Sequence, residues 1–421
     1  MAFLVFASRN GSSLLTSAAA RAWCPAIGRL SHHDLQAPLS SHKGSGLLYQ
    51  RRHFSSKPQI TYRISVSCSA KGRPFNPEKT CYNFDSVQHS ALADNPNSKS
   101  KRQNRLGCGE DAFFVSRVGN DLAAVAFGVA DGVGGWAEFG IDPADFSHGL
   151  CSYMAKSALH WEHPVERLRP KNLIQMGYNM LLEDGSISAG GSTASVGVAQ
   201  KDGRLELANL GDSGSVLLRL AAVHHYSVPQ THDFNTPYQL SMIPPQRRAQ
   251  GVTFGGSYIE DLPRDAVVTN VGMQHGDVLI LATDGVFDNL NNQDILKIIT
   301  TRMISAGAWE GSAAEGIGIS ERLNELTKPG GVDIEFLSPQ TSFKSAEQPS
   351  KSVLCNGTYG HTLQALLAAS IVGEAKLASI DSRRDGPFAK EAQRYFPWEV
   401  YHGGKVDDIC ALVVVAVEAV P

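Results

Sequence analysis

The chain has 421 residues, of which 42% are hydrophobic and 19% are charged, and its formal net charge is −3. This composition is typical of a globular protein with one large domain or two small ones, and it excludes the strongly basic surface of a general nucleic-acid binder. The longest near-continuous apolar run, Ile409 to Val420, is shorter than the roughly 18 residues that span a bilayer, so we expect no transmembrane segment.

The cysteine pattern favours a reducing compartment. The cysteines are odd in number, and no two of them form a Cys-x-x-Cys pair. We therefore predict neither a zinc site nor a disulfide framework. The cysteines are Cys24, Cys68, Cys81, Cys108, Cys151, Cys355 and Cys410.

Residues 1–54 differ in composition from the rest of the chain. They are rich in arginine and serine, and Asp34 is their only acid. Such N-termini are typical of organelle transit peptides, and Arg52-His53-Phe54-Ser55 resembles a mitochondrial processing site. We predict that this segment directs the protein to the mitochondrion, with the matrix as the expected compartment. A merely disordered tail is the alternative.

The folded part begins with a lead-in segment at residues 55–105. Alternating apolar residues predict a half-buried strand at Tyr62–Cys68. Residues 72–105 are polar, and we expect them to form an exposed loop.

A hairpin is predicted next. Two apolar strands, Ala112–Val118 and Ala123–Ala130, flank a Gly-Asn-Asp turn. Antiparallel pairing would bring Glu110 and Asp111, at the start of one strand, beside Asp131 at the end of the other.

Asp131 stands at an unusual place, the end of the apolar run that begins at Val125. A desolvated and unpaired carboxylate costs several kcal/mol, so it needs a cation or a set of donors. The glycines that follow, Gly132, Gly134 and Gly135, allow the backbone to turn sharply and to approach a bound group. For one isolated Asp-Gly pair, a simple turn would be the better interpretation.

The remaining elements follow from apolar periodicity and from turn residues. We predict helices at 143–160, 171–183, 313–326 and Tyr359–Ala378, and a further helix that begins near Asn292. Asp142 is the expected cap of the helix at 143–160, and Asp288-Asn289 is the expected cap of the helix that begins near Asn292. We predict strands at Thr193–Gln200, Leu205–Leu210, Gly214–Leu220, Asp277–Thr283 and Ile409–Val417. Residues 229–245 form a loop of the kind that is often functional, and residues 327–357 form a flexible insertion.

Acidic residues lie at the ends of several of these strands. Asp131, Asp212 and Asp284 each close an apolar strand, and the pairs Glu110-Asp111 and Asp407-Asp408 each open one. If the strands belong to two packed sheets, the acids meet at one rim, where like charges raise one another's pKa unless cations bind. Their ligand atoms are all oxygens, which favours Mg²⁺ or Mn²⁺ over Zn²⁺. Two such ions about 4 Å apart would suit hydrolysis of a phosphate ester. A set of turn acids and helix caps is the alternative, which we prefer for Asp288 and Asp408 taken alone.

Six short motifs carry a family resemblance. They are Arg105-x-x-x-x-Glu110-Asp111, Ala130-Asp-Gly-x-Gly-Gly-Trp136, Gly190-Gly-Ser-Thr-Ala194, Leu210-Gly-Asp-Ser-Gly214, Ala282-Thr-Asp-Gly-Val-Phe-Asp-Asn289 and Gly404-Lys-x-Asp-Asp-Ile409. Each is weak alone, but together and in this order they resemble the metal-dependent protein serine/threonine phosphatases of type 2C, the PPM family. Asp131-Gly-Val-Gly-Gly-Trp, Phe234-Asn-Thr-Pro-Tyr-Gln-Leu-Ser and Gly404-Lys-Val-Asp-Asp are similar to a mitochondrial subgroup found from fungi to animals. The resemblance covers roughly residues 62–420.

The resemblance implies an α+β fold, a four-layer α-β-β-α sandwich of two antiparallel sheets flanked by helices, with a catalytic domain at 106–421. It also implies roles for single residues. Asp131 would bridge two Mg²⁺ or Mn²⁺ ions, Asp284 and Asp407 would complete one site, and Glu110 with the carbonyl of Gly132 would complete the other. Asp111 would act through water. Asp212 and Asp288, with Asp284, match a weaker third metal site.

Two positions depart from the family pattern. Many members carry a histidine as general acid where this chain has Val133, which cannot donate a proton. We hypothesise that a metal-bound water takes that part. The phosphate-binding arginine normally lies four residues before the glutamate, but Arg105 lies five before Glu110, so an exposed arginine is an equal alternative. His232 is a weaker candidate acid, and a histidine packed within its loop is the better interpretation.

The function predicted from the resemblance is removal of phosphate from serine or threonine of phosphorylated mitochondrial proteins, by a hydroxide that bridges two metal ions. The subgroup further implies a link to coenzyme Q biosynthesis, and a monomer is expected. The alternative of a different class is a catalytically weak relative that binds phosphoproteins without turnover. A small-molecule phosphatase on the same fold is a third possibility.

Overall fold

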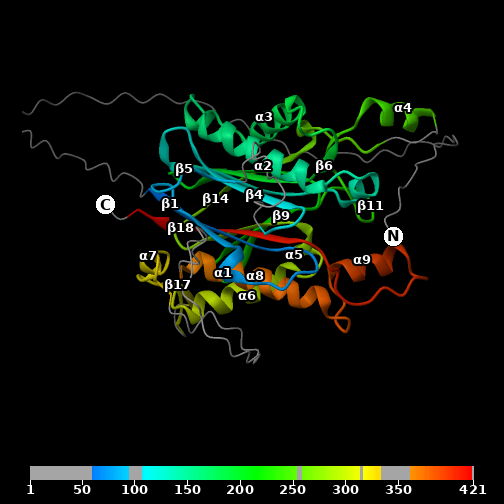
Figure 1. The fold of residues 1–421 in the computed structure, drawn as a ribbon. Coiled ribbons are helices and arrows are strands. Elements are labelled where there is room, and N and C mark those ends of the chain that lie inside the picture. The colour runs from blue at the N-terminus through cyan, green and yellow to red at the C-terminus, as the bar shows by residue number, and fades with distance from the viewer. Residues whose placement is uncertain (1–58, 94–106, 254–257, 313–315, 333–360, 420–421) are drawn as a thin grey trace, which may run out of the picture.

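The computed structural model describes residues 59–93, 107–253, 258–312, 316–332 and 361–419 (Figure 1). The predicted transit peptide, Arg105 and most of the predicted insertion at 327–357 lie outside the described residues.

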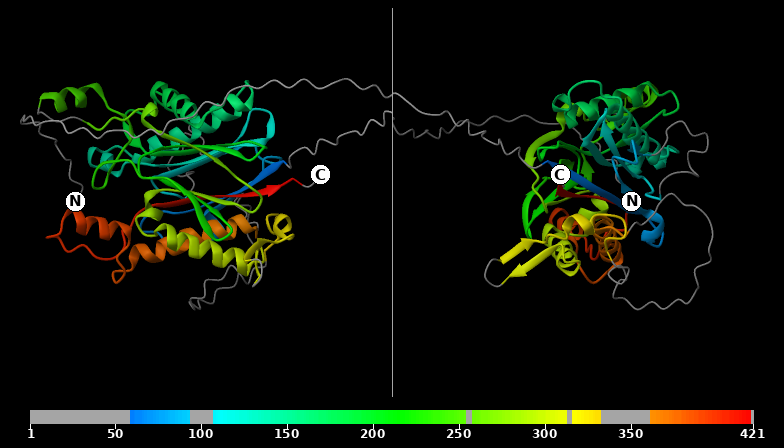
Figure 2. Two further views of the ribbon diagram at one scale, coloured as in Figure 1. Left: turned by 180° about the vertical axis from the view of Figure 1, so that it is seen from behind. Right: turned by 90° about the vertical axis from the view of Figure 1, so that its left-hand side faces the viewer.

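Two six-stranded antiparallel sheets lie face to face between two layers of helices (Figures 1 and 2). The first sheet contains, in spatial order, β10 (Ala222–Tyr226), β9 (Gly214–Arg219), β15 (Val278–Ala282), β18 (Ile409–Glu418), β1 (Ile60–Ser69) and β2 (Cys81–Phe84). The second contains β14 (Val267–Gly272), β8 (Arg204–Leu210), β7 (Ala194–Ala199), β5 (Asp121–Asp131), β4 (Asp111–Val118) and β3 (Ala91–Leu92). The predicted α-β-β-α sandwich is therefore confirmed.

Helices cover the outer face of each sheet (Figure 2). The long helices α2 (Pro143–Leu159) and α3 (Pro170–Glu183) lie over the second sheet, and α6 (Asn292–Ser305) and α8 (Leu363–Ile380) lie over the first. The described part also contains the shorter helices α1 (Pro77–Thr80), α4 (Pro245–Thr253), α5 (Asp284–Phe287), α7 (Leu323–Leu326) and α9 (Pro387–Tyr395).

Strand β18 shows why the central strands have almost continuously apolar sequences. Alternate side chains of a strand point to opposite faces of its sheet. Ile409 and Val413 pack in the core beneath α6 and α8, whereas Leu412 and Val414 pack in the core between the sheets. Both faces are buried, so no polar alternation remains in the sequence.

Helix α8 is long and apolar enough, by length and composition, to cross a membrane, and it is the one such helix among the described residues. However, 61% of this segment is buried inside the protein. Leu363, Leu366 and Ile371 contribute to the core against the first sheet. Packing as a core helix accounts for its composition.

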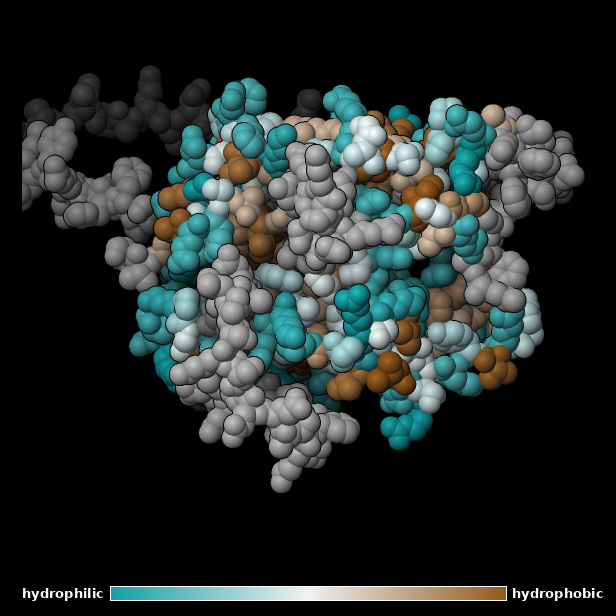
Figure 3. All heavy atoms as spheres, in the orientation of Figure 1, coloured by the Kyte–Doolittle hydropathy of each residue, from teal (hydrophilic) through white to brown (hydrophobic). Residues whose placement is uncertain are grey.

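The surface seen in Figure 3 is mostly hydrophilic, with small scattered apolar patches.

Most predicted elements are present, but several local predictions are wrong. Residues 72–105 were expected to form an exposed loop, whereas their described part contains α1, β3 and the strand β2, which pairs with β1 and has Cys81 and Phe84 buried. Residues 313–326 were expected to form a helix, whereas strands β16 (Trp309–Ser312) and β17 (Gly316–Ile319) form a hairpin there and α7 is a single turn. Gly316 and Gly318 alternate with isoleucines, which is a strand pattern that disfavours a helix. The cap of α6 is Asn291, whose side chain accepts hydrogen bonds from the backbone N–H groups of Gln293 and Asp294.

Residues 229–245, predicted as a loop, contain three short strands. They are β11 (Thr231–Asp233), β12 (Thr236–Pro237) and β13 (Leu240–Met242), and β13 pairs with β6 (Gly190–Ser192).

Candidate active site

The predicted hairpin brings the first acidic residues together. Strands β4 and β5 pair antiparallel with Asp111 directly opposite Asp131. The backbone N–H of Gly132 donates to the carbonyl of Glu110 at 3.2 Å, and the N–H of Asp131 donates to Thr193 Oγ1 at 3.1 Å. The end of this hairpin is thus fixed by backbone and side-chain hydrogen bonds.

The first sheet contributes three more acids. Strands β15 and β18 are neighbours with Ala282 opposite Ala411, so Asp284 after β15 lies near Asp407 and Asp408 before β18. The two sheets meet through Thr283, whose Oγ1 donates to Asp111 Oδ2 at 2.7 Å. The acids predicted at strand ends therefore converge at one end of the sandwich.

Asp408 is a positioning residue in this arrangement. Its Oδ1 accepts the N–H of Lys71 at 2.5 Å, and its Oδ2 accepts the N–H of Glu110 at 2.9 Å. The side chain is buried and joins the segment after β1 to the segment before β4. From the sequence alone, Asp408 had no definite role. The hydrogen bonds show that a carboxylate there can accept two backbone N–H groups.

The carboxylates raise one another's pKa. Burial, followed by the charges of Asp284 and Asp111, raises the pKa of Asp131 well above its usual range. Burial, followed by the charge of Asp408, likewise raises the pKa of Asp111 well above its usual range. Burial raises the pKa of Glu110 to about 7, with Asp408 as the next cause. Such a cluster holds its full negative charge only when cations compensate it.

Asp212 and Asp288 belong to the same electrostatic cluster. Burial and then the charge of Asp284 raise the pKa of Asp212 to about 7. Burial also raises the pKa of Asp288 well above its usual value, although Lys405 opposes this.

Lys405 lies among these acids, and no role was predicted for it from its motif, Gly404-Lys-x-Asp-Asp-Ile409. Its Nζ lies 2.6 Å from Asp284 Oδ2, 2.6 Å from Asp288 Oδ2 and 3.2 Å from Asp407 Oδ2. Burial acts to raise the pKa of Asp284, but this ammonium group brings it below its usual value. The position of Lys405 two residues before Asp407 was the available signal in the sequence.

Comparison with known proteins identifies the family. A protein of Saccharomyces cerevisiae named protein phosphatase 2C homolog 7, mitochondrial, is 40% identical over 269 residues, which cover 62% of this chain and 77% of the relative. The human protein phosphatase PTC7 homolog is 36% identical over 239 residues, which cover 56% of this chain and 72% of the relative. The chain belongs to the protein phosphatase 2C family. It is a protein serine/threonine phosphatase, as the motifs predicted.

No family model matches the chain. Among solved structures, the photosystem II phosphatase PBCP aligns with a TM-score of 0.49 and 24% identity, covering 77% of this chain and 97% of that chain. The name of the yeast relative places it in mitochondria, which supports the mitochondrial location predicted for this phosphatase 2C member.

The donor set of this phosphatase 2C member fits a hard divalent cation. Within the described residues, no three carboxylate, imidazole or thiol side chains already surround one point closely enough to hold an ion. Even so, Asp111 Oδ1 and Asp284 Oδ1 are buried and have no hydrogen-bond partner in the described part of the chain. Buried and unpaired carboxylate oxygens are costly, and an oxygen-ligated Mg²⁺ or Mn²⁺ would satisfy them.

The two positions that depart from the family pattern, and the candidate acid His232, have different outcomes. Val133 is half-buried and packs against the cluster of Trp136, Ala189 and Ile243, and its N–H donates to the carbonyl of Gly191 at 3.0 Å. His232 binds the carboxylate of Asp261 through Nε2 at 2.9 Å and stacks on Tyr238, which agrees with a histidine packed within its loop. Arg105 lies outside the described residues, so its phosphate-binding role stays a prediction.

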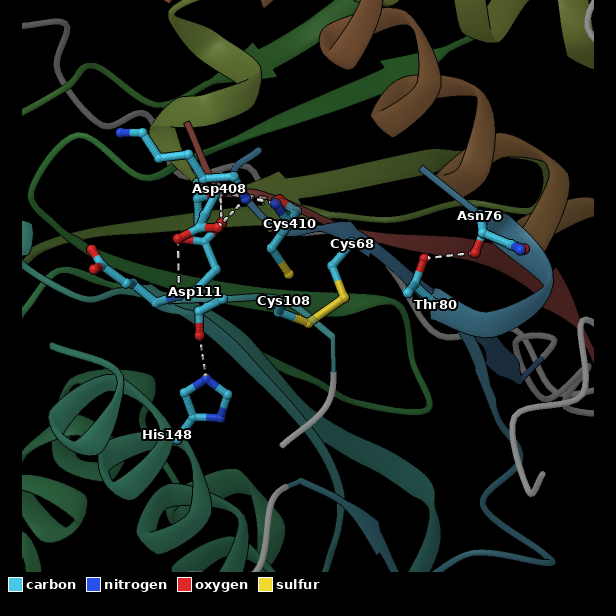
Figure 4. Close-up of a disulfide and its surroundings, with 12 residues drawn as sticks. Cys68, Asn76, Thr80, Cys108, Asp111, His148, Asp408 and Cys410 are labelled. Carbon is cyan, nitrogen blue, oxygen red and sulfur yellow. Dashed lines mark hydrogen bonds between the residues drawn. A yellow bond between two sulfur atoms is a disulfide. The ribbon is translucent and has the colours of Figure 1, made fainter. Parts of the chain in front are cut away.

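The prediction of a cysteine set without disulfides is wrong. Cys68, at the end of β1, and Cys108, just before β4, form a disulfide with a Cα–Cα distance of 5.1 Å (Figure 4). The pairing depends on how a strand of one sheet meets a segment entering the other, which spacing along the chain does not reveal. The bond fixes the segment that leads to Glu110 and Asp111, and Figure 4 shows Cys108, Asp111 and Asp408 gathered there.

Proposed function

We propose that this protein is a divalent-metal-dependent phosphatase that acts on phosphoserine and phosphothreonine in mitochondrial proteins. The observation that carries the proposal is the convergence of acids from strand ends of both sheets, with raised pKa values and unpaired buried oxygens. Glu110, Asp131, the Gly132 carbonyl, Asp284 and Asp407 would hold two Mg²⁺ or Mn²⁺ ions. Asp111 would support them through water.

The chain's own residues define how the centre is organised. When bound, the ions would neutralise charge on the phosphate and lower the pKa of a water molecule. Thr283 and Asp408 hold the carboxylate-bearing segments of the two sheets at a fixed separation. Val133 leaves the leaving group without a side-chain proton donor at that position.

The test is metal-dependent hydrolysis of p-nitrophenyl phosphate and of a phosphothreonine peptide by the full chain. We expect activity with Mn²⁺ or Mg²⁺ that is lost with a chelator. Asp131→Asn should lower it by about a hundredfold or more, which is the size of effect that follows removal of one preorganised electrostatic group from an active site. Asp121→Asn is the matched control, because Asp121 lies at the opposite end of the same strand.

Two results would contradict the proposal. One is a wild-type chain that is inactive with both metals, and the other is an Asp131→Asn chain as active as the control. Capture of a phosphoprotein without turnover would support the non-catalytic alternative.

The substrate class is the finer part of the proposal. The mitochondrial name of the yeast relative supports mitochondrial phosphoproteins as substrates, and the subgroup resemblance extends this to proteins of coenzyme Q biosynthesis. Phosphoproteomics of mitochondria lacking the protein should show increased phosphoserine or phosphothreonine on its substrates. An unchanged phosphoproteome would contradict this part alone.

A further inference from the structure

The ammonium group of Lys405 lies where carboxylates were expected to bind a third metal ion. It is 2.6 Å from one oxygen of Asp284 and 2.6 Å from one oxygen of Asp288. These distances are those of charge-assisted hydrogen bonds. Only 16% of the lysine side chain and 22% of the Asp288 side chain are exposed, so the contact is largely shielded from solvent.

The surroundings of the ammonium group complete a site for a cation. Asp407 Oδ2 is 3.2 Å away, and Asn235 Oδ1 is 3.4 Å away. The ring of Phe388 lies with its centroid 5.0 Å from Nζ, which is within the range of a cation–π contact. Carboxylates, an amide oxygen and an aromatic face thus surround one positive charge.

The backbone of Lys405 is also held in place by its neighbours. Asn289 is fully buried, and its Oδ1 accepts the N–H of Lys405 while its Nδ2 donates to the carbonyl of Lys405, each at 2.9 Å. Gly404 lies so close to α8 that a Cβ there would be 2.1 Å from the carbonyl oxygen of Ala378. The backbone of Lys405 therefore cannot shift freely, and this keeps its side chain beside the acids.

A divalent ion held by the same two oxygens of Asp284 and Asp288 would have to displace the ammonium group, because like charges at this separation repel strongly. We propose that Lys405 is the resident cation of this subsite. The active centre then takes two divalent ions, and Asp288 is the partner of the lysine and not a metal ligand. This inference rests on the metal dependence of the proposed function.

Counting bound ions tests the inference without an activity measurement. The full chain is dialysed to equilibrium against saturating Mn²⁺, and manganese per chain is measured by mass spectrometry. We expect two ions in the wild type and in Asp288→Asn. We expect a third bound ion in Lys405→Met. The double variant that combines Lys405→Met with Asp288→Asn should bind two ions again. Lys390→Met, which removes an exposed lysine of α9, is the matched control and should keep two ions.

The outcomes separate the inference from the proposed function. A wild-type chain without bound manganese would overturn the proposed metal dependence. Three ions in the wild type, fewer in Asp288→Asn, or no gain in Lys405→Met would overturn the inference alone. If Lys405→Met does not fold, anomalous scattering from a wild-type crystal grown with Mn²⁺ decides. Lys405 Nζ should remain between Asp284 and Asp288, and a manganese peak there would refute its role.

Discussion

Thr283 donates a 2.7 Å hydrogen bond from Oγ1 to Asp111 Oδ2, and this bond joins the acidic ends of the two sheets. Both side chains are buried. The same hydroxyl oxygen accepts the N–H of Cys410 at 3.0 Å. One small side chain therefore contacts β4 of one sheet and β18 of the other.

Replacing Thr283 by valine should destabilise the protein. The change keeps the shape but leaves the N–H of Cys410 and an oxygen of Asp111 buried without partners. The free energy of unfolding should fall by about 1–3 kcal/mol, measured by urea unfolding with a chelator present. Thr283→Ser keeps the hydroxyl and is the control. Equal losses in the two variants would show that the methyl group, and not the hydrogen bonds, matters at this position.

The stability of the metal-free protein should fall as pH rises. Burial, with the charges of neighbouring acids, raises the pKa of Glu110 from 4.5 to about 7 and that of Asp212 from 3.8 to about 7. Between about pH 4 and about pH 7, Glu110 and Asp212 bind more protons in the folded state than in the unfolded state. Their contribution to stability is therefore fully present below about pH 4 and is lost as pH rises through about 7. Thermal unfolding in the presence of a chelator, from pH 5 to pH 8, measures the slope.

Two comparisons test the cause of that slope. Asp212→Asn should reduce it, because the amide carries no charge to be repelled, and Asp121→Asn should leave it unchanged. Saturating Mn²⁺ should oppose it, since a bound cation favours the ionised carboxylates. A chelated wild-type protein whose stability rises over this range would contradict the argument.

The parts of the site that are local in sequence were predictable. The pairing of Asp111 with Asp131 follows from two apolar strands and a short turn, because antiparallel neighbours place the start of one strand beside the end of the other. The capping of α2 by Asp142 follows from Asp-Pro at the start of an apolar helix.

The parts that depend on contacts between the sheets were not predictable. The placement of Lys405 between Asp284 and Asp288 requires the packing of the segment before β18 against α5. The Cys68–Cys108 bond likewise joins positions 40 residues apart that only the completed sandwich brings together. Periodicity specifies which face of an element is buried, and it does not specify which element covers that face.

Removing the Cys68–Cys108 disulfide should lower stability. A cross-link that closes a loop of this size restricts the unfolded chain, and its loss typically costs about 2–4 kcal/mol. Cys68→Ser combined with Cys108→Ser should therefore unfold at lower urea than the wild type. Dithiothreitol should lower the wild-type midpoint toward that of the variant and leave the variant unchanged. A wild-type midpoint that is insensitive to complete reduction would contradict a stabilising bond.

Replacing Gly285 by alanine should disturb both acidic segments of the first sheet. A Cβ at Gly285 would lie 1.9 Å from the carbonyl oxygen of Asp408, so the segments that carry Asp284 and Asp408 would have to separate. Overpacking of this kind typically costs about 1–3 kcal/mol. Gly185→Ala is the matched control, since nothing lies within 4 Å of a Cβ there.

The two alanine variants are compared by urea unfolding and by manganese affinity from calorimetric titration. Gly285→Ala should lose stability and bind Mn²⁺ more weakly, because the shift moves Asp284 relative to Asp131 across the two sheets. Gly185→Ala should match the wild type in both measurements. If Gly285→Ala loses stability but keeps full manganese affinity, the contact with Asp408 serves the fold and does not set the spacing of the metal-binding carboxylates.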